Sequence, residues 1–157
     1  MPDIILEKKN RVATITLNRP EARNAITRSG WVELLSILTD LATDDNVGCV
    51  VITGAGDAFC AGGDVKDMVA RLGETDHPPV DEQAAFIRQI VETSTLLHEM
   101  PKPTIAAING AAAGAGLSLA FACDLRLMAE DAKLTTAFSN VALSGDFGGA
   151  YFLSKIV

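Results

Sequence analysis

The chain has 157 residues, 48% of them hydrophobic and 21% charged, a balance typical of one globular domain with a sizeable core. Its formal net charge of −7 argues against a general nucleic-acid-binding protein, but a local cation or a helix N-terminus could still bind an anionic small ligand. No apolar run is long enough for a membrane span, and the N-terminus lacks the layout of a signal peptide. The three cysteines lie far apart without metal-ligand spacing, so we expect reduced thiols, a cytoplasmic protein and no metal site.

The first half of the chain predicts two strands and two helices. Residues 11–18 alternate between apolar and polar side chains, which indicates a half-buried strand. From Thr27, a suitable N-cap, apolar residues recur at helical spacing as far as Leu41. Residues 47–56 form a short apolar run closed by glycines, which predicts a strand buried on both faces. A short helix is expected to begin near Asp64.

The second half continues the alternation of helices and strands. Residues 71–80 are polar and rich in glycine and proline, which predicts a mobile surface connection. The remaining elements are a helix over 82–100, a buried strand within 104–110, a turn and apolar helix over 111–124, strands at 125–130 and 133–138, and the start of a helix at 148–157. This order indicates an α/β fold.

Two glycine-rich segments each follow a buried strand and open a helix. Such junctions offer unpaired N–H groups to an anion or to a developing negative charge. Neither segment has the spacing of a P-loop or of a dinucleotide-binding fingerprint. Ser118 lies in a sequence reminiscent of a nucleophile elbow, but no histidine follows it in the chain. We therefore expect Ser118 to be a helix residue whose hydroxyl bonds back to a carbonyl.

Three segments together carry a family resemblance: "LNRPEARNAI" (17–26), "AFCAGGDVK" (58–66) and "KPTIAAINGAAAGAGLSLAFACD" (102–124). Their order and separation resemble those of the enoyl-CoA hydratase/isomerase, or crotonase, superfamily. The resemblance implies an α/β crotonase-like spiral of ββα turns (ClpP/crotonase fold). It also implies that residues 1–157 form the N-terminal spiral core of a single domain, with a C-terminal helical part missing.

The resemblance also implies an oxyanion hole and a set of contacts to coenzyme A. The backbone N–H groups of Gly63 and Ala115 are the expected donors to an enolate oxygen, and an oxyanion needs such preorganised donors. The implied CoA contacts are Arg23 and Ala25 along the pantetheine, Ala61 near the adenine, Asp64 in the same motif and Lys66 near the phosphates. For Lys66, a solvated position on the helix face is an almost equal alternative. CoA belongs to the substrate, so no cofactor is expected.

The acid–base group is where the chain departs from the hydratase pattern. The two glutamates of hydratases fall on Ser118 and on or near Phe138, so neither carboxylate is present. Asp146 remains, at a position that several isomerase branches use as a base and a dehalogenase branch as a nucleophile. The alternative is that Asp146 only caps the next helix. Asp64 and Asp124 are expected to be structural carboxylates that pair or cap at the ends of elements.

The resemblance therefore predicts an enzyme of acyl-CoA or fatty acid metabolism, most specifically an enoyl-CoA double-bond isomerase. The alternatives are an enoyl-CoA hydratase, which is a lyase, and a non-catalytic acyl-CoA-binding or assembly module. The expected partner is an acyl-CoA substrate, with no nucleic acid and no membrane. A homotrimer or a dimer of trimers is the expected assembly.

Overall fold

The structure is a computed structural model that describes residues 1–72 and 78–157. Its larger sheet has five strands in the order β1-β2-β3-β5-β7. Only β1 and β2 are antiparallel; the other neighbours are parallel. The strands are β1 (Ile4–Lys9), β2 (Val12–Leu17), β3 (Cys49–Gly54), β5 (Thr104–Ile108) and β7 (Leu125–Met128).

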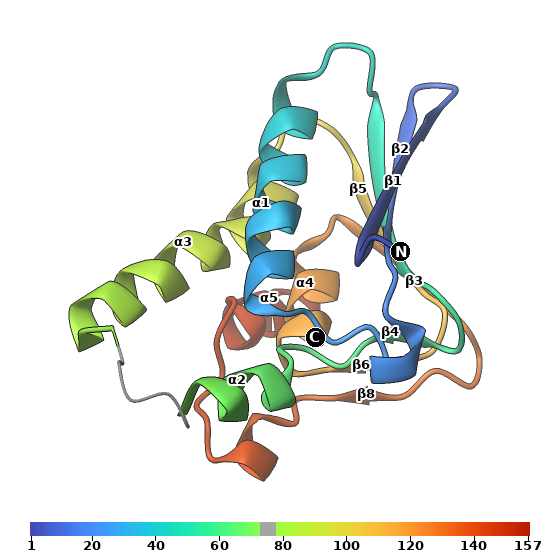
Figure 1. The fold of residues 1–157 in the computed structure, drawn as a ribbon. Helices are drawn as coiled ribbons and strands as arrows, with labels where there is room; N and C mark the ends of the chain where they lie inside the picture. The colour runs from blue at the N-terminus through green and yellow to red at the C-terminus, as the bar shows by residue number, and fades with distance from the viewer. Residues whose placement is uncertain (73–77) are drawn as a thin grey trace.

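A smaller parallel sheet lies at one end of the larger one, with its strands running across it (Figure 1). It consists of β4 (Ala58–Cys60), β6 (Ala111–Ala113) and β8 (Leu134–Thr135). Each of these strands follows a strand of the larger sheet and leads into a helix, so the chain winds through successive ββα turns. The predicted α/β spiral is therefore confirmed.

The helices begin and end close to their predicted positions. They are α1 (Arg28–Thr43), α2 (Val65–Leu72), α3 (Val80–Glu99), α4 (Gly114–Ala122) and α5 (Gly149–Ile156), with short 3-10 turns η1 (Pro20–Ala22) and η2 (Phe138–Val141). The hydroxyl of Thr27 accepts the N–H of Gly30 at 3.1 Å, as expected of the N-cap. Residues 73–77 of the predicted surface connection lie outside the described residues. Within the described residues, no helix is long and apolar enough to cross a membrane.

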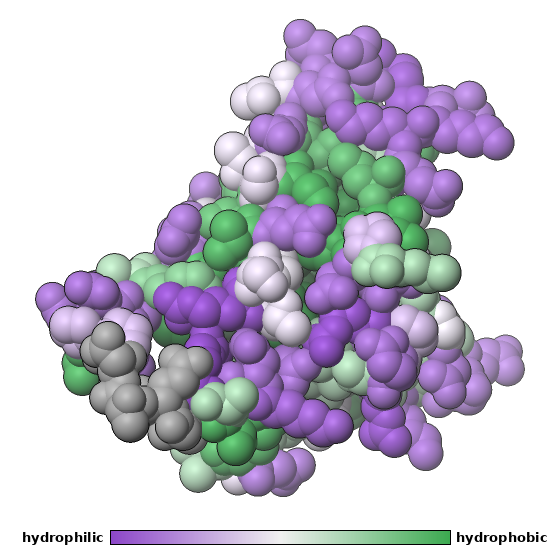
Figure 2. Space-filling model, viewed as in Figure 1, coloured by the Kyte–Doolittle hydropathy of each residue, from purple (hydrophilic) through white to green (hydrophobic). Residues whose placement is uncertain are grey.

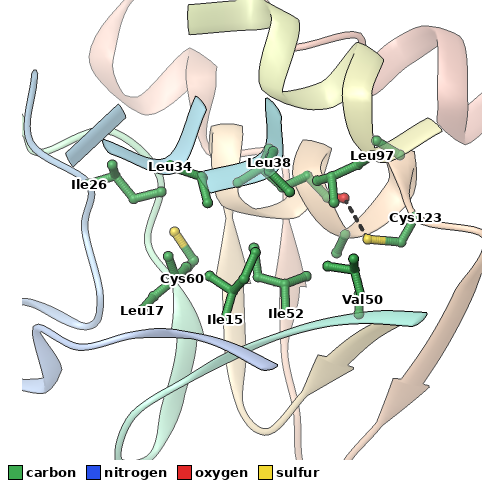
Figure 3. Close-up of a cluster of buried hydrophobic side chains, with 14 of the residues drawn as sticks. Ile15, Leu17, Ile26, Leu34, Leu38, Val50, Ile52, Cys60, Leu97 and Cys123 are labelled. Carbon is green, nitrogen blue, oxygen red and sulfur yellow. Dashed lines mark hydrogen bonds between the residues drawn. The ribbon is translucent and has the colours of Figure 1, made fainter. Parts of the chain in front are cut away.

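The main core lies between the larger sheet and the helices packed on it (Figure 3). The side chains that meet there are all 2% exposed or less: Ile15, Leu17, Val50 and Ile52 from the sheet, Leu34 and Leu38 from α1, and Leu97 from α3. Burying an aliphatic side chain of this size contributes about 1.5–3 kcal/mol. This packing gives a rigid base to the loops that leave β3 and β5.

The burial of the side chains on β3 and β5 differs from the prediction. The sequence predicts that β3 is buried on both faces and that β5 is buried, but the side chains of both strands alternate between buried and half-buried positions. Val50 and Ile52 face the core, while Val51 and Thr53 are only half-buried. The helices α1, α3 and α4 pack on the same face of the sheet, which accounts for the difference (Figure 1).

Candidate active site

Two glycine loops meet at a cavity of about 140 Å³. Gly63, Ala115 and Asp146 all line this cavity, although they lie in three separate segments of the chain. Ala61 and Asp64 line it as well. The fold therefore brings together the two expected oxyanion donors and the expected acid–base group.

The N–H of Gly63 is directed by a short pairing between two loops. Gly63 and Ile26 form an isolated parallel bridge, in which Ile26 N–H donates to the Gly62 carbonyl at 2.8 Å and Asp64 N–H donates to the Ile26 carbonyl at 3.0 Å. Parallel pairing through these flanking groups leaves the N–H of Gly63 on the other side of the strand. It is therefore available to a ligand.

The second donor comes from the start of α4 and lies close to the first loop. Ala115 is the second residue of α4, so its N–H has no partner inside the helix. A Cβ atom added to Gly62 would lie 3.2 Å from the Ala115 nitrogen and 3.1 Å from the Ala113 carbonyl oxygen. Gly62 also has a φ of +96°, a conformation that glycine adopts most easily. The adjacent glycines thus permit both the turn and the contact between the loops.

The thiol of the buried residue Cys60 hydrogen-bonds to the first glycine loop and to a neighbouring segment. The Cys60 Sγ accepts the Gly62 N–H at 3.3 Å and donates to the Asn24 carbonyl at 3.2 Å. Burial raises the pKa of the Cys60 thiol to about 12, although the Gly62 N–H opposes this shift. A Cβ atom at Gly116 would lie 2.6 Å from the same sulfur, so α4 packs directly against it. Cys60 is therefore a protonated structural thiol rather than a nucleophile.

The carboxylate of Asp64 is occupied by structural partners. Its Oδ2 lies 2.7 Å from Arg19 Nη1, and its Oδ1 accepts the N–H groups of Lys66 and Asp67 at the start of α2. Burial would raise the pKa of Asp64, but these hydrogen bonds outweigh it and the net pKa is lowered. The side chain thus pairs and caps as expected, while a CoA contact by Asp64 stays a prediction.

Asp124 has a structural role at the start of β5. Its Oδ2 accepts the N–H of Thr104 at 2.8 Å and the Thr104 hydroxyl at 3.1 Å, and the Asp124 N–H donates back to that hydroxyl at 2.9 Å. These bonds join the end of α4 to β5, as expected for a carboxylate that ties two elements together.

Three of the expected CoA contacts do not line the cavity. Arg23 is exposed, and its carbonyl accepts the Ala61 N–H at 2.9 Å. The N–H and the carbonyl of Ala25 both bond within the protein, to Ala22 and Arg19 respectively. Lys66 is exposed on α2. Their contacts with CoA stay predictions.

Asp146 does not cap the following helix. The N-cap of α5 is Gly148, and no side chain bonds to it. The alternative interpretation of Asp146 as a helix cap is therefore wrong. Its Oδ1 is buried without a hydrogen-bond partner in the described part of the chain, and burial raises the pKa of the carboxyl. A half-buried carboxylate on a cavity wall, with one oxygen that has no partner in the described part of the chain, is suited to exchange a proton with a ligand.

Aromatic and aliphatic side chains complete the cavity wall. The rings of Trp31 and Phe147 pack with centroids 4.4 Å apart, and the Arg28 guanidinium lies 3.3 Å above the centroid of Phe86. All four of these residues line the cavity. The sequence patterns did not indicate that these four residues belong to the site. The adjacency of Phe147 to Asp146 was the one available signal, whereas the helical periodicity of α1 indicates only that Trp31 is buried.

A second cavity of about 330 Å³ adjoins the first, with Gly114, Phe138 and Leu143 lining both. Ser118 lines the second cavity but is only 2% exposed. Figure 2 shows apolar surface at the bottom of the view, over the segment that includes η2. The apolar side chains exposed in this segment are Val141 and Leu143, which also line the first cavity.

Comparison with known proteins places the chain in a family. The model of the enoyl-CoA hydratase/isomerase family matches residues 7–157. The chain belongs to this family.

Two relatives and one solved structure illustrate the likeness. The 1,2-epoxyphenylacetyl-CoA isomerase of Escherichia coli is 36% identical over 156 residues, which is 99% of this chain and 58% of that protein. The mitochondrial Delta(3,5)-Delta(2,4)-dienoyl-CoA isomerase of Rattus norvegicus is 33% identical over 157 residues, covering 98% and 48%. The crystal structure of an enoyl-CoA hydratase from Polaromonas sp. JS666 has a TM-score of 0.86 at 35% identity, covering 98% and 58%. The chain thus spans about half the length of the relatives it matches.

Proposed function

We propose that this protein is an acyl-CoA-processing enzyme that stabilises a thioester enolate, and most specifically an enoyl-CoA double-bond isomerase. One observation carries the proposal. The half-buried carboxylate of Asp146, whose Oδ1 has no hydrogen-bond partner in the described part of the chain, belongs to the same cavity as the N–H-bearing residues Gly63 and Ala115.

The proposed reaction moves one proton along the acyl group. The Asp146 carboxylate removes a proton from the α-carbon of a 3-enoyl thioester, and the electron pair of the broken C–H bond passes to the thioester oxygen as a dienolate. The N–H groups of Gly63 and Ala115 hydrogen-bond that oxygen, and losing one such donor typically costs about 2.7–4 kcal/mol of barrier. The Asp146 carboxylic acid then returns the proton to the γ-carbon, which yields the 2-enoyl thioester. No other reactant or cofactor is needed.

The hydratase alternative is less well supported by the residues present. Adding water requires one group to activate the water and another to deliver a proton. At the two expected glutamate positions the chain has Ser118, whose hydroxyl bonds to backbone carbonyls, and Phe138. A single acid–base group, Asp146, suits a proton shuttle better.

The test is to supply the protein that carries this chain with a 3-enoyl-CoA and, separately, with a 2-enoyl-CoA. We expect conversion of the 3-enoyl ester to the 2-enoyl ester, with little hydration of the 2-enoyl ester. Hydration as the faster reaction would favour the lyase alternative. Binding of CoA esters without α-proton exchange in heavy water above background would favour a non-catalytic module.

We also propose that the protein is cytoplasmic and assembles as a homotrimer or a dimer of trimers. Leu125 and Leu127 on β7 are 56% and 65% exposed, and burial between subunits would remove this apolar surface from water. Light scattering on the protein that carries this chain is expected to give the mass of three or six subunits. A stable monomer would contradict the assembly.

A further inference from the structure

One buried hydroxyl connects the helix of the oxyanion hole to the segment of Asp146. Ser118 lies one turn after Gly114 on α4, and its Oγ is 3.3 Å from the Gly114 carbonyl and 3.2 Å from the Asp146 carbonyl. A hydroxyl has a single hydrogen, so the two carbonyls share it. Ser118 thereby connects the main chain of Asp146 to the turn of α4 that carries the Ala115 N–H.

A glycine on the facing helix makes room for this hydroxyl. A Cβ atom at Gly149 would lie 2.5 Å from the Ser118 Oγ, so the close approach of α5 requires a residue without a side chain. The Gly149 N–H also donates to the Asp146 carbonyl at 3.1 Å. The main chain of Asp146 is thus held from both sides, by α4 and by α5.

The segment around Asp146 has little other regular support. Residues 142–148 belong to no helix or strand, and three of them, Ala142, Phe147 and Gly148, have positive φ angles. Such a segment keeps its position only where side chains and neighbouring elements hold it. Besides Ser118 and Gly149, the contact of Phe147 with Trp31 holds it in place.

We infer that Ser118 is a positioning residue. Its hydroxyl holds Asp146 at a fixed position relative to the proposed oxyanion donors, Gly63 and Ala115. The inference rests on the proposed function, because it concerns the same proton transfer. A displacement of about 1 Å in a catalytic group can reduce the rate about a hundredfold. A residue that only stabilised the fold would not affect the chemical step in this selective way.

The hydrogen bond between the Ser118 hydroxyl and the Asp146 carbonyl should also affect the pKa of the Asp146 carboxyl. Among the described residues, the charged side chains that line its cavity with it are Arg28 from α1, Asp64, which precedes α2, and Asp67 and Arg71 from α2. Burial raises the pKa of Asp146, and a hydrogen bond from its own backbone N–H opposes this shift. If the segment loosens, water reaches the carboxyl and the pKa falls toward its ordinary value. The acid limb of the rate profile should then move to lower pH.

The experiment measures steady-state isomerisation of a 3-enoyl-CoA by three variants of the protein that carries this chain. For Ser118→Ala we expect kcat to fall about ten- to a hundredfold, KM to stay within about twofold, and the acid limb of kcat to move to lower pH. Gly149→Ala should give the same changes, because its methyl group displaces the hydroxyl while alanine favours the helix. Ser94→Ala is the matched control, since Ser94 is buried on α3 and its hydroxyl has no partner in the described part of the chain. The control should leave kcat and KM unchanged.

Several results would overturn the inference. A Ser118→Ala variant with kcat within about twofold of wild type and an unmoved acid limb would remove Ser118 from this role. A rise in KM alone would mean that the hydroxyl contacts the substrate instead. If Ser94→Ala lowered kcat as much as Ser118→Ala, the loss would be a general effect of removing a buried hydroxyl. Asp146→Asn separates the two proposals: if it stays active, the proposed function fails, whereas if it is inactive and Ser118→Ala is normal, only this inference fails.

Discussion

The guanidinium of Arg19 lies 2.7 Å from the carboxylate of Asp64, and this contact joins two distant sequence motifs. Arg19 also donates to the Ala25 carbonyl at 2.8 Å. Because Asp64 directly follows Gly63, the ion pair anchors the residue that we propose as the first oxyanion donor. Its side chains are 21% and 10% exposed, so the pair is more shielded from water than an ordinary surface ion pair.

Asp64→Asn should destabilise the protein, and the loss should show how much the ionic interaction with Arg19 contributes to stability. Asparagine can still cap α2 but loses the ionic bond to Arg19, so we expect a cost of about 1–3 kcal/mol at neutral pH. The pKa of Asp64 is lowered in the folded protein, so its contribution is present above the unfolded value of 3.8 and is lost as pH falls through the folded pKa. Denaturant unfolding of both proteins between pH 3 and pH 7 checks this. A stability difference that did not shrink at acid pH would contradict the ionic explanation.

Gly62→Ala should reduce catalysis much more than Gly48→Ala. The new Cβ at position 62 would lie 3.2 Å from the Ala115 nitrogen, and the φ of +96° is strained for any other residue. The N–H groups of Gly63 and Ala115, the proposed oxyanion donors, should therefore separate, which we expect to lower kcat by about a hundredfold or more. At Gly48, which precedes β3, the nearest atom to a Cβ is 3.5 Å away on the Arg11 side chain, so this control should keep its activity. Equal activities of the two variants would argue against the oxyanion hole.

The long elements and the glycine loops could be predicted from the sequence because their signals are local. Thr27 marks the start of α1, and the apolar run before Gly54 marks β3. The strand β1 was missed, since of its residues only Ile4 is buried and the others follow no apolar alternation. It forms because it pairs along its whole length with β2.

The short strands and the supports of the site could not be predicted in the same way. The strand β6 consists of three alanines, which carry no periodicity, and it exists because β4 and β8 lie on either side of it. The bonds from Cys60 to Gly62 and Asn24 likewise depend on segments that meet only in the folded chain. Sequence motifs therefore predict the candidate site residues, while tertiary contacts determine how these residues are held.

The rate of isomerisation should rise with pH over a range that is set by the pKa of the Asp146 carboxyl. Burial raises the pKa of this carboxyl above its ordinary value of 3.8, and only the ionised form can take a proton. We therefore expect kcat to fall on the acid side at a pH above the ordinary pKa of an aspartate. A pH–rate profile with a stable 3-enoyl-CoA measures this limb. A flat profile down to pH 4 would show that burial does not control the catalytic group.

Asp146→Asn distinguishes a proton shuttle from a structural residue. Asparagine keeps the shape of the side chain but cannot ionise, so kcat should fall about a hundred- to ten-thousandfold, as for a lost general base. Affinity for a CoA ester should change little, because the proposed thioester contacts are the N–H groups of Gly63 and Ala115. Burial raises the pKa of Asp146 in the folded wild type, so ionisation of this carboxyl opposes folding and the neutral variant should be at least as stable at pH 7. Isomerase turnover, the dissociation constant of a CoA ester and thermal unfolding together check all three expectations. Turnover above about a tenth of the wild-type value would exclude Asp146 as the base.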